Sequence, residues 1–120
     1  MAYVDGFVFP ISTRNVAAYR KIAAKAGKIW KEHGALEYRE CVGDDLRVMK
    51  GMGSFKKTHK IAANETLVFS WIVYTSRKQR DQVNTKVMED PRLAAMMKPG
   101  AMPFDLKRML MGGFKVIVDL

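Results

Sequence analysis

Apolar side chains follow one another almost without interruption in residues 65–74, ETLVFSWIVY. The segment is short for a buried helix, and its β-branched and aromatic residues favour a strand. Thr75 and Ser76 end it, and a basic run with helical character follows. We therefore predict a central strand covered on both faces, and this requirement organises the rest of the fold.

Three further strands are indicated by shorter patterns. The side chains of residues 3–11 alternate between the two faces of a strand, and Pro10 is expected at the end of that strand. Residues 36–42 alternate less regularly, and residues 107–118 form the last strand, where a pair of glycines predicts a bulge.

A long helix is predicted over residues 14–33, because its apolar positions recur at steps of three and four. Ser12 or Thr13 is expected to cap its amides, and Gly34 suits the left-handed residue that ends a helix.

A second helix is predicted over residues 77–89, with Ser76 as its cap. Asp90 and Pro91 should end it, since a residue before proline avoids helical angles. Asp90 is also expected to cap a short helix over residues 92–98.

The order strand, helix, strand, strand, helix, strand predicts an α+β, ferredoxin-like βαββαβ fold. It is a four-stranded antiparallel sheet with the helices on one face. A faint internal repeat, which aligns Val4 with Val68 and Ser12 with Ser76, indicates two similar halves. Residues 43–64 form a connection long enough to suggest a functional or mobile loop.

The repeat also predicts which side of the sheet each residue occupies. It places Val4, Gly6 and Val8 under the helices with alternate residues of 68–72. The uncovered side then collects Asp5, Phe7, Phe9, Phe69, Trp71 and Val73. Such an aromatic face predicts a homodimer, sheet facing sheet about a two-fold axis, with any pocket inside the barrel so formed.

The bulk composition fits one domain over residues 1–120. The single cysteine cannot form an internal disulfide, and neither a signal peptide nor a membrane span is indicated. We therefore expect a cytoplasmic protein with no membrane association. The net charge of +9 would attract anionic partners.

Several segments together resemble those of a bacterial family of uncharacterised proteins in the dimeric α/β-barrel superfamily. They are YVDGFV, ECVGDD, FSWIVYTSR, DPR, MPFDLKRM and GGF, and the resemblance runs over nearly the whole chain. It implies the ferredoxin-like fold and the dimer. The superfamily includes cofactor-free monooxygenases, isomerases, dehydratases and haem enzymes, with their sites inside the barrel.

Two charged residues are candidates for catalysis. Asp5, a carboxylate among aromatic residues, would have a raised pKa if buried and could act as a general base. The alternative is a structural pair with Arg108 or with a backbone amide. Arg108, next to Lys107, could hold a carboxylate or phosphate, or it could simply be a solvated charge.

Candidate ligand-binding residues lie on three of the strands. Phe69 and Trp71, with Phe7 on the same predicted face, offer flat walls for an aromatic ligand, although core or dimer-interface packing is the simpler explanation. Tyr38 and Glu40 share one side of their strand and would add a phenol and an acid if that side lines the pocket.

No metal and no cofactor are predicted, because two distant histidines and one cysteine match no metal-ligand spacing. Basic residues cluster on the predicted outward sides of the two helices: Arg14, Arg20, Lys21, Lys25, Lys28, Lys31, Arg77, Lys78, Arg80 and Lys86. Such charge usually forms a solvated surface, and no RNA-recognition signature accompanies it.

The sequence thus predicts a homodimer that binds a small aromatic or apolar molecule in its barrel. If it is an enzyme, cofactor-independent oxygenation or isomerisation is expected. The alternatives are a basic module that binds RNA or an acidic partner, and a structural dimer without catalysis.

Overall fold

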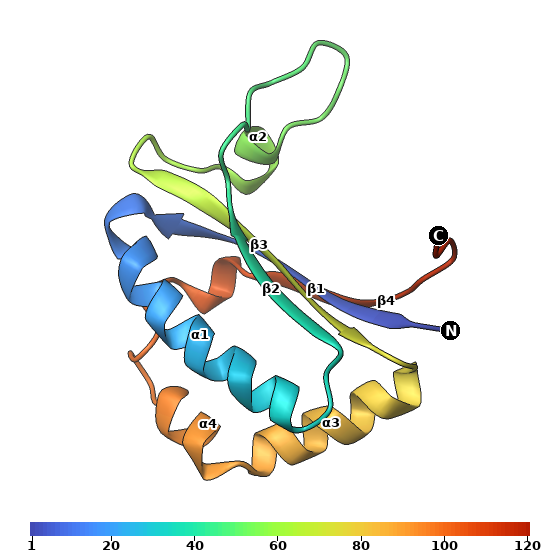
Figure 1. Ribbon diagram of the computed structural model, residues 1–120. Helices are drawn as coiled ribbons and strands as arrows, with labels where there is room; N and C mark the ends of the chain where they lie inside the picture. The colour runs from blue at the N-terminus through green and yellow to red at the C-terminus, as the bar shows by residue number, and fades with distance from the viewer.

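The computed structural model describes all 120 residues and shows one antiparallel sheet with three of its four α-helices on one face (Figure 1). The strands are β1 (Tyr3–Ser12), β2 (Glu37–Val42), β3 (Glu65–Tyr74) and β4 (Leu110–Lys115). The α-helices are α1 (Val16–Glu32), α2 (Phe55–His59), α3 (Arg77–Glu89) and α4 (Pro91–Met96). The 3-10 turns are η1 (Thr13–Asn15) and η2 (Leu106–Arg108). The strand order β2-β3-β1-β4 confirms the predicted ferredoxin-like fold.

The register between β1 and β3 determines which side chains face the helices. Asp5 lies opposite Ile72, and Phe7 lies opposite Ser70. Directly opposed residues share a face, so Asp5, Phe7 and Phe9 point towards the helices. The predicted side of β1 is therefore wrong, whereas that of β3 is right.

The error comes from the repeat that set Val4 on Val68. The turn η1 lies between β1 and α1, and α3 follows β3 with no such turn. The two helices therefore begin at Val16 and Arg77, which are separated by an odd number of residues. The repeat had assumed an even separation between corresponding residues of the two halves. An odd shift moves every side chain of a strand to the other face. The same turn explains why Ser12 makes no side-chain cap.

The hydrophobic core lies between the sheet and α1, α3 and α4, in two clusters. One cluster joins α1 to α3 and α4 and consists of Ala26, Ile29, Ala35, Ile72, Tyr74, Val83, Val87 and Leu93. The other consists of Phe9, Ile11, Tyr19, Ala23 and Val68. Phe104, from the link before β4, stacks on Phe9 with 4.0 Å between ring centroids, which ties that link to the core.

Three of the predicted helix ends are confirmed. The Ser76 side chain accepts a hydrogen bond from the Gln79 amide at 3.1 Å, and Asp90 accepts one from the Arg92 amide at 2.9 Å. Gly34, which follows the C-cap residue His33 of α1, has a φ of +118°, which favours glycine.

An ion-pair cluster ties the end of α1 to the junction of α3 and α4. Nε2 of His33 lies 2.8 Å from Oδ2 of Asp90, and Arg92 bridges Asp90 and Glu32. Hydrogen bonds from Arg92 and His33 hold the pKa of Asp90 well below its ordinary value. The cluster therefore joins three helices through side chains that are distant in the sequence.

The last strand is shorter than predicted. The Asp105 side chain accepts a hydrogen bond from the Lys107 amide at 2.9 Å and sets up η2, so β4 begins only at Leu110. Its register opposite β1 is continuous, and the predicted bulge is absent.

Gly113 of β4 is required by close approach rather than by a bulge. A Cβ atom there would overlap the Tyr3 hydroxyl and lie 2.8 Å from Nη2 of Arg80. A side chain at this position would therefore displace Arg80 from the sheet.

The long connection between β2 and β3 extends away from the sheet and contains α2 (Figure 1). Cys41, near the end of β2, is exposed. None of the helices combines the length and the apolar character that crossing a bilayer requires.

Candidate functional site

A cavity of about 300 Å³ lies between the sheet and the helices. Of its 24 lining residues, 20 are hydrophobic, so the space favours an apolar occupant. Methionines line its outer part: Met88, Met96, Met97, Met102, Met109 and Met111. Their flexible thioethers suit a wall that adapts to its ligand.

Glu40 of β2 is the first polar group in this cavity. Its Oε1 accepts hydrogen bonds from the hydroxyls of Tyr38 at 2.8 Å and Tyr19 at 2.9 Å. Its Oε2 is buried and has no hydrogen bond of ordinary geometry, although Ser70 lies directly opposite Glu40 in the register with β3. Burial raises the pKa of Glu40 against the effect of these hydroxyls. Burial and the adjacent carboxyl group raise the phenol pKa of Tyr19 and Tyr38.

Asp5 of β1 is the second carboxyl group in the cavity and is 5% exposed. Nε of Arg80 lies 3.5 Å from its Oδ1, and Arg80 also donates to the Tyr3 hydroxyl at 3.0 Å. Burial raises the pKa of Asp5, and the Arg80 guanidinium opposes that rise. The partner of Asp5 is therefore Arg80, and not Arg108 as the structural alternative had assumed.

A small polar network lies at the end of the cavity beside Asp5. The Tyr74 hydroxyl and Nε1 of Trp30 both donate to Oδ1 of Asn84, at 3.3 and 3.4 Å. All three residues line the cavity. They fix the orientation of the Asn84 amide, so that polar contacts at this end are preorganised.

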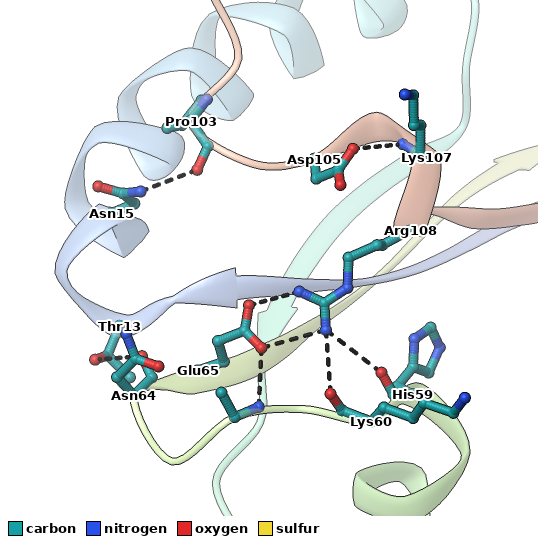
Figure 2. Close-up of polar contacts among 11 residues, drawn as sticks. Thr13, Asn15, His59, Lys60, Asn64, Glu65, Pro103, Asp105, Lys107 and Arg108 are labelled. Carbon is teal, nitrogen blue, oxygen red and sulfur yellow. Dashed lines mark hydrogen bonds and ion pairs between the residues drawn. The ribbon is translucent and has the colours of Figure 1, made fainter.

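Arg108 does not line the cavity. Figure 2 shows its guanidinium pointing towards Glu65, His59 and Lys60. Its guanidinium forms two hydrogen bonds to the Glu65 carboxylate, at 2.7 and 3.2 Å. It also donates to the backbone carbonyls of His59 and Lys60. The structure therefore uses Arg108 to join η2 to the connection that contains α2.

The other candidates divide between the two faces of the sheet. Phe7, Tyr38 and Glu40 line the cavity together with Asp5. Phe69 and Trp71 pack edge to face on the opposite side, with 5.5 Å between ring centroids. Trp71 still borders the cavity, whereas Phe69 does not.

Sequence reasoning missed four residues of the site: Tyr19, Tyr74, Arg80 and Asn84. Arg80 had been grouped with the outward basic residues, but its side chain is only 22% exposed. It precedes the buried Val83 by three positions, a spacing that already placed it on the inner side of α3.

In contrast to Arg80 of α3, the basic residues of α1 are exposed, as predicted. A separate open groove beside this helix is lined by Lys28, Lys31 and Arg39, and also by Glu32 and Glu37. Because both signs of charge mix there, the groove does not form a single cationic surface. No group of three or more His, Cys, Asp and Glu side chains could hold a metal ion.

These observations define a ferredoxin-like α+β protein with an apolar cavity that contains two carboxyl groups. The chain resembles a solved structure, a NIPSNAP family protein with unknown function from Agrobacterium tumefaciens strain C58, with a TM-score of 0.56. The two are 17% identical over 96% of this chain and 87% of the other, so the likeness concerns the fold.

The chain belongs to the family described as protein of unknown function DUF1428, which matches residues 2–106. It is 45% identical to the Uncharacterized protein YbaA of Escherichia coli K12, over 99% of each chain. The protein of the same name in Shigella flexneri matches equally. The predicted resemblance to an uncharacterised bacterial family is confirmed.

Proposed function

We propose that this protein binds a small, mainly apolar molecule in the cavity between sheet and helices, and acts on it without a cofactor. The observation that carries the proposal is one cavity that combines apolar walls with two carboxyl groups: Asp5 is buried, and Glu40 is half-buried with its Oε2 atom shielded from solvent. Buried carboxyl groups lower folding stability unless they are compensated, so their presence together in a cavity favours a functional role.

Asp5 is the proposed base. The neighbouring Arg80 favours its ionised form, and the apolar surroundings make that carboxylate a stronger base than it would be in water. Isomerisation and cofactor-independent oxygenation both begin with loss of a proton from the substrate, so a base at this position serves either reaction. Phe7 and Tyr38 supply aromatic walls.

Titration with tetralin, a bicyclic hydrocarbon, tests the binding. Ligand-observed NMR should detect binding to the wild-type protein and not to Ala23→Phe, which fills the cavity from α1. Ala17→Phe is the matched control, because Ala17 is exposed on the same helix. Native mass spectrometry of the gently purified protein gives a second measurement, a mass lost on denaturation. Tetralin that binds equally to both variants would contradict the proposal.

We also propose that two copies associate through the open face of the sheet. This face carries apolar residues from three strands: Val4, Val8, Phe69, Trp71, Val73, Leu110 and Phe114. A monomer rarely leaves such a continuous patch exposed, and a two-fold dimer buries it.

Sedimentation velocity tests the dimer. Phe69→Glu should give monomers, because it places charges in the buried face. Val48→Glu is the matched control, since Val48 is 48% exposed and Phe69 is 45% exposed, but Val48 lies in the connection before α2. A wild-type protein that sediments as a monomer at high concentration would refute the proposal.

A further inference from the structure

The two carboxyl groups of the cavity lie in opposite electrostatic environments. Asp5 has a cation, Arg80, at 3.5 Å. Glu40 takes part in no ion pair, and its partners are the two neutral hydroxyls of Tyr19 and Tyr38. A carboxylate shielded from solvent without a cation is disfavoured, so the environment of Glu40 favours its protonated form more than an exposed site would.

The proton of Glu40 has a defined position. Both tyrosine hydroxyls donate to Oε1, so Oε2 is the oxygen that carries the hydrogen. Oε2 makes no hydrogen bond of ordinary geometry within the protein, although the Ser70 hydroxyl lies near the Glu40 carboxyl group and opposes the rise in its pKa. A buried O–H group without an acceptor is unfavourable, and an acceptor supplied by a ligand would remove that cost.

We infer that the cavity takes a carbonyl compound with a hydrogen on the adjacent carbon, with Asp5 as the base and Glu40 as the acid that donates to the carbonyl oxygen. This inference rests on the proposed function and specifies its substrate class. Two carboxyl groups that differ in this way are the usual arrangement for paired acid and base catalysis.

The spacing of the two groups fits such a ligand. Asp5 is opposite Ile72 of β3, and Glu40 is opposite Ser70 of the same strand. Strands about 4.8 Å apart and a rise of about 3.4 Å per residue place their Cα atoms roughly 12 Å apart. Both residues line the cavity, so a ligand in it can contact the two carboxyl groups at separate atoms.

The reaction is a balanced proton transfer. The Asp5 carboxylate removes the hydrogen from the carbon next to the carbonyl, and the electron pair of that bond forms a carbon–carbon double bond. The carbonyl oxygen takes the proton of Glu40 and becomes the hydroxyl of an enol. The negative charge thus moves from Asp5 to Glu40, where the hydroxyls of Tyr19 and Tyr38 stabilise it. When Asp5 returns a proton to the same carbon and the enol hydroxyl returns its proton to Glu40, the carbonyl compound is restored with one hydrogen exchanged. In a substrate with a double bond conjugated to the enol, delivery of the proton to the far end of that bond completes an isomerisation.

Hydrogen–deuterium exchange of 2-tetralone in D₂O tests this step, because each enolisation exchanges a hydrogen next to the carbonyl. NMR should show that the wild-type protein accelerates exchange above the buffer rate. Asp5→Asn should abolish the acceleration, and Glu40→Gln should reduce it about 100-fold while 2-tetralone still binds. Glu37→Gln is the matched control, because Glu37 lies on the other face of β2.

Tyr38→Phe is a second variant, which leaves both carboxyl groups in place. Removal of one donor to Glu40 should slow exchange at least about tenfold without loss of binding. Thermal unfolding of each variant checks that it folds.

The outcomes separate the two proposals. Binding of 2-tetralone without faster exchange, or exchange that Glu40→Gln leaves unchanged, would overturn this inference and leave the binding proposal intact. If neither 2-tetralone nor tetralin binds, the proposed function fails, and the inference fails with it.

Discussion

The contact between Gly27 of α1 and Tyr38 of β2 allows a sharp test of the cavity geometry. A Cβ atom on Gly27 would lie 2.6 Å from Cδ1 and 3.2 Å from Cγ of the Tyr38 ring. Cγ is the end of the ring attached to the backbone, so a small rotation cannot relieve the overlap. The Tyr38 hydroxyl is also held at 2.8 Å from Glu40.

Two effects oppose each other in the Gly27→Ala variant. Alanine in a helix interior stabilises by about 1 kcal/mol relative to glycine. Overpacking of a core costs about 1–3 kcal/mol, and loss of the Tyr38–Glu40 hydrogen bond adds about 0.5–1.5 kcal/mol. The free energy of unfolding should therefore fall by about 1–3 kcal/mol, which lowers Tm by roughly 5–10 °C in a chain of this size.

A double-mutant cycle isolates this contact. Urea unfolding is measured for the wild type, Gly27→Ala, Tyr38→Leu and the double variant. Once the ring is absent, Gly27→Ala should stabilise by up to about 1 kcal/mol, so the sign of its effect reverses. A Gly27→Ala protein that is more stable than the wild type would refute the packing described between α1 and β2.

Other contacts make shorter predictions. Because its partners hold the pKa of Asp90 low, its contribution to stability is present above the ordinary carboxyl pKa of about 4 and is lost as the pH falls. The difference in unfolding free energy between the wild type and Asp90→Asn should therefore shrink from pH 7 to pH 3 in urea titrations. Arg108→Ala should speed proteolysis within residues 54–62, and Lys107→Ala should not, by limited digestion and mass spectrometry. Gly113→Ala should lower Tm by displacing Arg80, whereas Gly112→Ala should change it little, because its nearest contact is an ordinary 3.5 Å.

The strand and helix order could be predicted because its signals are local. The apolar run of 65–74, the cap at Ser76 and the break at Asp90 each depend on neighbours within a few positions. The family resemblance depends on the same short segments. Local signals were sufficient for the fold class.

The side of β1 that points towards the helices could not be predicted, because both of its sides are apolar. Phe7 and Phe9 alternate with Val4 and Val8, so alternation alone does not distinguish a core face from an open one. The pairing register with β3 decides the matter, and it depends on a turn, η1, that the helical pattern does not reveal.

Contacts between residues distant in the sequence could not be predicted either. Arg108 pairs with Glu65, which is distant in the chain, and only the fold brings η2 beside the start of β3 (Figure 2). Tyr38 and Glu40 were correctly paired on one side of their strand, but the register opposite Ile72 and Ser70 was needed to place that side in the cavity.

Because the proposed dimer interface and the cavity lie on opposite faces of the sheet, dimerisation and ligand binding can be tested separately. Phe69 belongs to the open face and does not line the cavity, whereas Trp71 borders both. Phe69→Glu should therefore yield monomers that still bind tetralin with unchanged affinity, while Trp71→Ala should weaken both the assembly and the binding. Sedimentation velocity and NMR titration on the same samples measure the two effects. Phe69→Glu monomers that fold normally but no longer bind tetralin would show that the cavity forms only when two sheets are joined.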